Sequence, residues 1–147
     1  MTSIVYRSKI HHGEHVALVK GVIDPELPTL VRVQLEFTFG DVFGGGNPPT
    51  RKQVHNSLKA IGQRGSGILL YLRRPVRGQI KDQIDSWQTK FHEKPASMMR
   101  EYGLGAQILR DLGVRKLELL TEKKREYIGL ETFGLEIVSQ HAIPESF

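Results

Sequence analysis

The stretch GILLYL at residues 67–72 indicates the fold class of this chain. A short, continuous apolar run of this kind is typical of a β-strand that is buried on both faces, as the strands of parallel sheets are. Helical periodicity lies on either side of it, because Val54, Leu58 and Ile61 recur at helical spacing before the run and GLGAQILRDLG follows at residues 103–113. Strands that alternate with helices predict an α/β fold with a mixed, largely parallel sheet covered by helices.

Further strands extend this sheet towards both ends of the chain. The segments EHVALVKG (14–21) and TLVRVQLEF (29–37) have the β-branched content and partial alternation of strands. Because the Pro-containing turn DPELP (24–28) joins them, we expect them to pair as an antiparallel N-terminal unit. KLELL (116–120) and LEIVSQ (135–140) are predicted as the last two strands.

The helix boundaries are predicted from capping residues. Thr50 and Gln53 have the spacing of a capping box, so the first helix is expected to begin at Thr50. Gly113 is expected to close the helix before it in the left-handed conformation, and Gly134 to close a helix over KKREYIGLETFG (123–134). One more helix, ending before Pro95, is predicted from apolar residues at helical spacing: Ile80, Ile84 and Trp87 or Gln88.

Length and composition predict a single globular domain. The chain has 147 residues, of which 39% are hydrophobic and 25% charged, so residues 1–147 are taken as one domain, with residues 1–12 as a linker or N-terminal extension. No apolar run approaches the roughly 18 to 20 residues that a membrane span needs, so we expect no membrane partner and a cytoplasmic location. The absence of cysteine excludes disulfides, thiolate zinc ligands and cysteine nucleophiles.

The charge of the chain is modestly basic. A net charge of +5 suits an anionic small molecule, nucleic acid or a solvated surface. Nucleic acid is the least favoured of these partners, because a basic stripe interleaved with aromatic residues is missing from the sequence. An anionic ligand could be bound by arginines that follow the buried strand, although these side chains could equally serve solubility: Arg73, Arg74 and Arg77.

Two other patterns have an ordinary explanation that we prefer. The glycine-rich stretch DVFGGGNPPTRKQ (41–53) lacks the spacing of a phosphate-binding loop, and Pro48 and Pro49 remove N–H donors that such a loop would use. It is therefore predicted to be a mobile loop. Histidines near the N-terminus could supply zinc ligands, but surface or strand-end positions are favoured for them: His11, His12 and His15.

Several segments together resemble GTP cyclohydrolase II, the zinc enzyme that opens the guanine ring of GTP at the start of riboflavin biosynthesis. The resemblance runs from Gly13 to Val138 and is most specific in YGLGAQILRDLGVRKLELLT (102–121). The other segments that carry it are EHVALVKG, RVQLEFTFGDVFG, GILLYLRR and IGLETFGLEIV. The resemblance implies that family's mixed sheet and a homodimer.

The resemblance also implies that the zinc site is lost. The family has its first zinc cysteine in a segment like RVHSECLTGD and the other two in SLRCDCG. This chain has RVQLEFTFGD and GGNPPTR there, which places Phe37, Pro48 and Thr50 at the three cysteine positions. None of these can be a thiolate ligand, so no metal and no cofactor are expected.

Other family positions are partly retained. Met98 stands where the family has the aspartate that accepts a proton, while Arg100 survives from the same motif. The family's QEGRG is RPVRG here, and its TNNPRK is TEKKRE, with Glu126 at the final lysine. The resemblance therefore implies a residual ligand pocket of Arg32, Glu36, Gln53, Arg77, Arg100 and Thr121.

Domains of this family are frequently fused behind 3,4-dihydroxy-2-butanone 4-phosphate synthase. The resemblance therefore implies an inactive GTP cyclohydrolase II homologue that supports or enhances that synthase, with the synthase domain as its partner in the same polypeptide. The alternative is a sensor that binds a nucleotide, sugar phosphate or flavin-pathway metabolite in the former GTP pocket. A new enzyme using His92 or Glu93 as an acid or base, and RNA binding, are less favoured hypotheses.

Overall fold

The computed structural model describes residues 1–7, 13–44, 49–73, 95–124, 126–127 and 129–145. For residues 39 and 95–102 it describes the backbone alone.

A six-stranded mixed sheet in the order β1-β2-β4-β3-β5-β6 forms the centre of the fold. Strand β2 is antiparallel to both of its neighbours, β1 and β4, whereas β3 is parallel to β4 and β5, and β5 is parallel to β6. The predicted fold class, a mixed sheet with an antiparallel N-terminal pair and helical cover, is therefore confirmed. The strands are β1 Thr2–Arg7, β2 Glu14–Lys20, β3 Thr29–Leu35, β4 Gly67–Leu72, β5 Lys116–Thr121 and β6 Glu136–Ala142.

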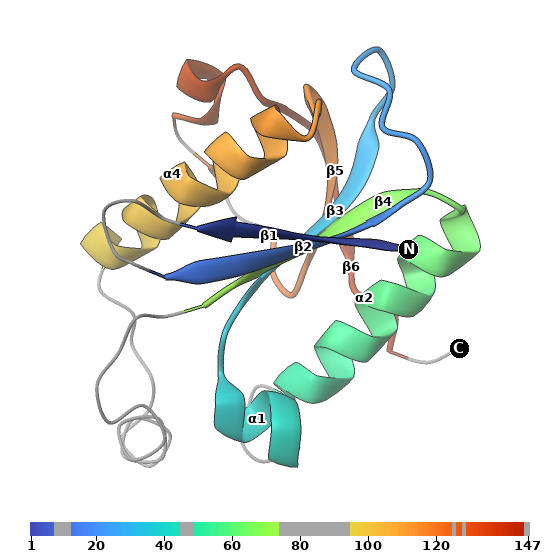
Figure 1. The fold of residues 1–147 in the computed structure, drawn as a ribbon, viewed down its shortest axis with the longest axis vertical. Helices are drawn as coiled ribbons and strands as arrows, with labels where there is room; N and C mark the ends of the chain where they lie inside the picture. The colour runs from blue at the N-terminus through green and yellow to red at the C-terminus, as the bar shows by residue number, and fades with distance from the viewer. Residues whose placement is uncertain (8–12, 45–48, 74–94, 125, 128, 146–147) are drawn as a thin grey trace.

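Two long helices cover opposite faces of the sheet (Figure 1). Helix α4 (Pro95–Asp111) packs Ala106, Ile108 and Leu109 against one face, and α2 (Thr50–Arg64) packs Ile61 against the other. Two shorter elements complete the helical part, α1 (Thr38–Phe43) and the 3-10 helix η1 (Leu130–Phe133). None of the helices in the described part of the chain has the length and apolarity of a membrane-spanning helix.

The predicted pairing of the segments at residues 14–21 and 29–37, which form β2 and β3, was wrong. Strands β2 and β3 do run antiparallel in direction, but β4 lies between them and pairs with both. The physical reason is that β4 is apolar on both faces: Ile68 and Leu70 contact the core on the α4 side, and Leu69 that on the α2 side. A central place in the sheet buries both of these faces.

The N-terminal residues contribute a strand that the sequence analysis had placed in an extension. Thr2–Arg7 form β1, which pairs with β2 in an uninterrupted register from Thr2 opposite Val19 to Arg7 opposite Glu14. Residues 8–12, the rest of the predicted extension, lie outside the described residues.

The predicted capping box was also wrong, although α2 does begin at Thr50. Pro49 is the N-cap residue, and the Gln53 N–H donates to the Pro49 carbonyl oxygen at 3.1 Å. Since helical geometry begins one residue after Pro49, Thr50 lies inside the first turn, where its side chain makes no capping hydrogen bond. Part of the predicted mobile loop is helical too, because Asp41 lies in α1, which Gly44 ends at a φ of 72°.

The helix predicted over residues 123–134 is reduced to one 3-10 turn. Gly129, with a φ of 91°, interrupts the helical pattern, and Gly134 closes the turn after Phe133 as predicted. Gly113, with a φ of 95°, ends α4 in the left-handed conformation, as predicted. The helix predicted around Ile80 and Ile84 lies outside the described residues.

A polar site at the carboxyl ends of the central strands

Polar side chains gather where the parallel strands β3 and β4 end, the edge at which α/β sheets place ligands. Glu36 follows β3, and its N–H donates to the Leu72 carbonyl oxygen at 2.8 Å. Its buried carboxylate accepts from Arg73 Nε at 3.1 Å and from the Thr38 hydroxyl at 3.0 Å. The ends of both strands and the start of α1 are thus joined at one carboxylate.

His15 joins β2 to the same point. The Arg73 N–H donates to His15 Nδ1 at 3.0 Å, so this ring nitrogen carries no proton and the imidazole is neutral. Burial lowers the pKa of His15, Arg73 lowers it further, and Glu36 opposes the shift. The buried ring therefore acts as a hydrogen-bond acceptor that closes the end of β4.

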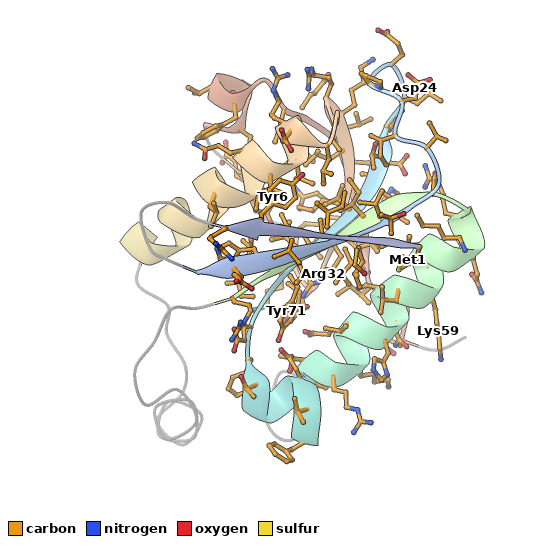
Figure 2. The ribbon with its side chains drawn as sticks, in the orientation of Figure 1. Met1, Tyr6, Asp24, Arg32, Lys59 and Tyr71 are labelled. Atoms are coloured by element: carbon orange, nitrogen blue, oxygen red, sulfur yellow. The ribbon has the colours of Figure 1, made fainter. Side chains whose placement is uncertain are left out.

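Asp41 of α1 organises the neighbouring turn. Its Oδ2 accepts a hydrogen bond from the Phe37 N–H at 3.0 Å and a second, short one from the Tyr71 hydroxyl of β4. In Figure 2 Tyr71 is labelled at the end of the sheet next to α1. Burial and the hydrogen bond to Asp41 raise the pKa of Tyr71. The phenol is a fixed donor, which holds α1 against β4.

Phe37 and Thr50 meet at Gly40. A Cβ atom built on Gly40 would come within 2.5 Å of Phe37 Cδ1 and closer still to Thr50 Oγ1. Gly40 is buried in α1, and the Phe37 ring and the Thr50 hydroxyl occupy the space that a side chain at this position would need. Phe37 directly precedes α1, and Thr50 is the first residue of α2.

The face of α2 that is turned to the sheet carries polar atoms without partners. Thr50 Oγ1, Gln53 Oε1 and Ser57 Oγ are buried and make no hydrogen bond, and they recur at the spacing of one helical face. That face continues with Ile61, which packs against Leu30 of β3. Buried polar atoms of this kind are usually satisfied by water or by a ligand, so this face of α2 could donate to or accept from either.

Arg32 lies on the face of β3 that is turned to α2, as Leu30 does, but it is held inside the protein. Its Nη2 and Nε donate to Gln34 Oε1 at 2.8 and 3.0 Å, and its Nη1 donates to the Leu120 carbonyl oxygen at 3.3 Å. Glu122 lies 3.5 Å from Nη2. Arg32 is therefore buried in a network between β3 and β5 rather than directed outwards; Figure 2 labels it at the centre of the sheet.

The predicted pocket residues are only partly brought together. Glu36, Thr50, Phe37 and Gln53 belong to adjoining elements at the ends of β3 and α2. Thr121 ends β5, where its hydroxyl donates to the Lys123 carbonyl oxygen at 2.8 Å. For Met98 and Arg100 the structure describes the backbone but not the side chains. The other predicted positions lie outside the described residues: His11, His12, Pro48, Arg74, Arg77, His92 and Glu93.

Sequence reasoning missed several members of the site. Gln34, Asp41, Tyr71 and Ser57 were not singled out, although Gln34 and Ser57 are polar residues at core positions of a strand and a helix, which is the signal that could have identified them. His15 and Arg73 were considered for other roles, and their contact could not be predicted because it depends on β2 pairing with β4.

A model of the GTP cyclohydrolase II family matches residues 1–142. The chain belongs to this family. Among curated relatives, the riboflavin biosynthesis protein RibBA of Bacillus cytotoxicus is 41% identical over 150 residues, which cover 94% of this chain and 38% of that protein. The RibBA protein of Parabacteroides distasonis is 36% identical, over 92% of this chain and 36% of that protein. The chain thus spans little more than a third of the length of these relatives.

A solved structure has a similar fold. It is RibBX from A. baumannii, described as a two-domain 3,4-dihydroxy-2-butanone 4-phosphate synthase. The TM-score is 0.50 at 20% sequence identity, and the match covers 97% of this chain and 39% of that one.

The residues that the resemblance places at zinc-cysteine positions do not fit zinc. The Phe37 side chain offers no donor atom, and the Thr50 hydroxyl lies against Gly40 and makes no hydrogen bond. Across the described residues no group of three or more His, Cys, Asp or Glu side chains could hold a metal ion. Phe37 and Thr50 therefore pack against Gly40 and are unsuited to bind zinc.

Proposed function

We propose that this chain is a catalytically inactive GTP cyclohydrolase II homologue that supports 3,4-dihydroxy-2-butanone 4-phosphate synthase in riboflavin biosynthesis. The observation that carries the proposal is that Phe37 and Thr50 both pack against Gly40. The resemblance assigns two of the family's three zinc cysteines to these positions. Opening the guanine ring needs a metal-activated water. A phenyl ring and an unpaired hydroxyl do not supply one.

The loss extends beyond the metal. Met98 at the aspartate position has no group that accepts a proton, so the general base would be missing as well. Removing either a metal-activated nucleophile or its base typically costs orders of magnitude in rate. The fold is nevertheless retained over the whole sheet, which supports a role in binding or stabilising a partner.

The synthase is the proposed partner for two reasons. The relatives are riboflavin biosynthesis proteins more than twice as long as the matched region, and the structural neighbour is described as a two-domain synthase. We place the synthase domain in the same polypeptide, in the cytoplasm, and propose that this chain forms a homodimer. In that arrangement it would stabilise the synthase or raise its activity.

A second candidate is a ligand sensor, favoured by the unpaired polar atoms on α2. Thr50, Gln53 and Ser57 offer buried hydrogen-bonding atoms on one face of α2. Together with Arg32, Arg77, Arg100 and Thr121 they would bind a nucleotide or sugar phosphate. Calorimetric titration with GTP and ribose 5-phosphate tests this candidate, with Gln53→Ala and Arg100→Ala as variants. Saturable binding that both variants weaken supports a sensor, and no heat at millimolar ligand removes it.

The main proposal is tested by two activity measurements. GTP consumption is followed with added zinc and with EDTA, using a family member that has all three cysteines as the positive control. We expect no consumption in either condition, and zinc-stimulated turnover would overturn inactivity. The second measurement is the synthase rate with and without this domain attached. A fall in kcat or kcat/KM on removal, with the synthase still folded, supports the partner role, and an unchanged rate overturns it.

A further inference from the structure

Arg73 is held at two points where β4 ends. Its backbone N–H donates to Nδ1 of His15 at 3.0 Å, and its side-chain Nε donates to Oε2 of Glu36 at 3.1 Å. The first contact joins the residue to β2 and the second joins it to the end of β3. Since the Thr38 hydroxyl donates to the other oxygen of Glu36, the carboxylate has a fixed place between its two partners. A buried carboxylate therefore neutralises Arg73, although the Arg73 side chain is 51% exposed.

The contact with His15 depends on pH, because Nδ1 of the imidazole accepts a hydrogen bond only while it carries no proton. A proton on this nitrogen turns it into a donor that faces the donor N–H of Arg73, so the hydrogen bond is lost. It also places a positive charge in a buried position, since His15 is 4% exposed. This charge repels the Arg73 guanidinium and attracts the Glu36 carboxylate. Both contacts of Arg73 are therefore weakened together.

The other titratable groups around His15 do not interfere. Tyr6 lies opposite His15 in the register of β1 and β2, but its hydroxyl donates to Asp111 of α4 at 2.8 Å. Burial and this hydrogen bond raise the pKa of Tyr6 to about 12, so the phenol keeps its proton. Glu14 lies on the other face of β2 and pairs with Arg7. Among the described residues, the exchange is thus confined to His15 and the two groups that hold or oppose its charge.

We propose that protonation of His15 releases the guanidinium of Arg73 and makes it available to an anion at the carboxyl ends of β3 and β4. While His15 is neutral, the guanidinium has Glu36 to itself. Once His15 is charged, the imidazolium and Arg73 share the one negative charge of Glu36, and the half-exposed guanidinium has donors for an oxyanion such as sulfate or phosphate. This inference is independent of the proposed inactivity towards GTP and of the support of the synthase.

Arg32, which lies near the same strand ends, is held in a different way. It donates to the Gln34 amide oxygen and to the Leu120 carbonyl oxygen, and neither of these groups titrates. The residue is also buried, whereas half of the Arg73 side chain is exposed. We therefore expect a change of pH to leave these contacts of Arg32 in place and to act on Arg73.

The first test follows His15 and Arg73 by NMR of the 147-residue chain from about pH 8 to about pH 5. We expect the backbone N–H and the Nε–H signals of Arg73 to shift with the midpoint of the His15 ring. In His15→Asn, whose amide oxygen accepts the same bond without titrating, both signals are expected to stay constant. Arg73 signals that do not follow the ring, or that titrate equally in His15→Asn, overturn the proposal, and so does a ring that stays neutral throughout.

The second test measures sulfate binding by calorimetry, because sulfate keeps its charge throughout this pH range. The dissociation constant of the wild type is expected to fall about tenfold from about pH 8 to about pH 5, the size of one charge-assisted hydrogen bond. His15→Asn is expected to remove most of this change, whereas His141→Asn, at an exposed histidine of β6, leaves it in place. Circular dichroism at both pH values checks that the variants are folded. No saturable sulfate binding at either pH overturns the proposal.

Glu36→Gln separates the release of Arg73 from a general gain of positive charge at low pH. Without the carboxylate, sulfate is expected to bind already at about pH 8, and Arg73→Gln is expected to abolish binding at both pH values. Arg7→Gln is the matched control, because Arg7 also pairs with a glutamate but at an exposed position, and it should leave binding unchanged. A folded Glu36→Gln variant that binds no sulfate at about pH 8 overturns the proposal, as does binding that Arg73→Gln does not weaken.

Discussion

The backbone N–H of Arg73 donates a hydrogen bond to Nδ1 of His15 at 3.0 Å, which only an unprotonated Nδ1 can accept. Burial and Arg73 lower the pKa of His15 in the folded protein. The unfolded chain then binds more protons than the folded one as the pH falls, so stability is present above the unfolded pKa, about 6.5, and is lost below it.

The first prediction follows from this loss of stability at low pH. The free energy of unfolding of the wild type is expected to decrease between pH 7.5 and pH 5 more steeply than that of His15→Asn, whose amide oxygen can accept the same bond without titrating. Urea unfolding at a series of pH values measures both slopes. Parallel pH profiles for the two proteins would show that His15 does not titrate in this range.

Gly40 is expected to tolerate no side chain. Gly40→Ala forces the new Cβ against Phe37 and Thr50, and we expect a loss of about 1 to 3 kcal/mol in the free energy of unfolding, as for other overpacked sites. Gly62→Ala is the matched control, because its Cβ meets nothing within 4 Å on the exposed side of α2. That variant should gain up to about 1 kcal/mol. Equal effects in thermal or urea unfolding would contradict the packing at Gly40.

The ion pair of Glu36 and Arg73 should contribute more than an exposed pair does. The Glu36 side chain is 7% exposed and that of Arg73 51%, against 49% and 78% for Glu14 and Arg7. Interaction energies of residues in contact range from about 0.5 to 3 kcal/mol. For Glu36 and Arg73, double-mutant cycles are expected to give a value near the lower end of this range, because Arg73 is half exposed. The Arg7 pair should couple by less than about 0.5 kcal/mol. A larger coupling for the exposed pair would refute this ranking.

Ser57 and Asn56 should respond oppositely to truncation. The Ser57 hydroxyl is buried without a partner, so Ser57→Ala is expected to be neutral or stabilising. The Asn56 amide donates to the Pro144 and Glu145 carbonyl oxygens at 2.8 and 3.2 Å, so Asn56→Ala is expected to cost about 1 to 3 kcal/mol. Urea unfolding compares the two. A large loss for Ser57→Ala would mean that a bound water or ligand satisfies its hydroxyl.

Much of the fold could be predicted because its elements have strong local signals. The apolar run of β4, the strand KLELL and the glycine that ends α4 are each determined by nearby residues. The order of the strands could not be predicted in the same way. Whether β2 lies beside β3 or beside β4 depends on which arrangement buries both faces of β4, and this is a property of the whole sheet.

The site shows the same division. The positions of Phe37 and Thr50 could be named from the resemblance, but the packing of both side chains against Gly40 depends on how α1 packs against α2. The missed α1 explains the missed Asp41, since the stretch after Glu36 carries glycines that favour a loop over a helix. The contact of His15 with Arg73 joins residues that are far apart in the sequence, and local patterns contain no information about it.

The placement of β4 between β2 and β3 also constrains the order of events as the chain folds. Strand β2 can pair with β1 as soon as both have been made, but β3 has neither of its native neighbours until β4 has been made through residue 72. An early hairpin between β2 and β3 would have to open again to admit β4. Since non-local strand pairing is slow, we expect folding to wait for the segment from α2 to β4, and an interrupted chain ending before it to be prone to aggregation.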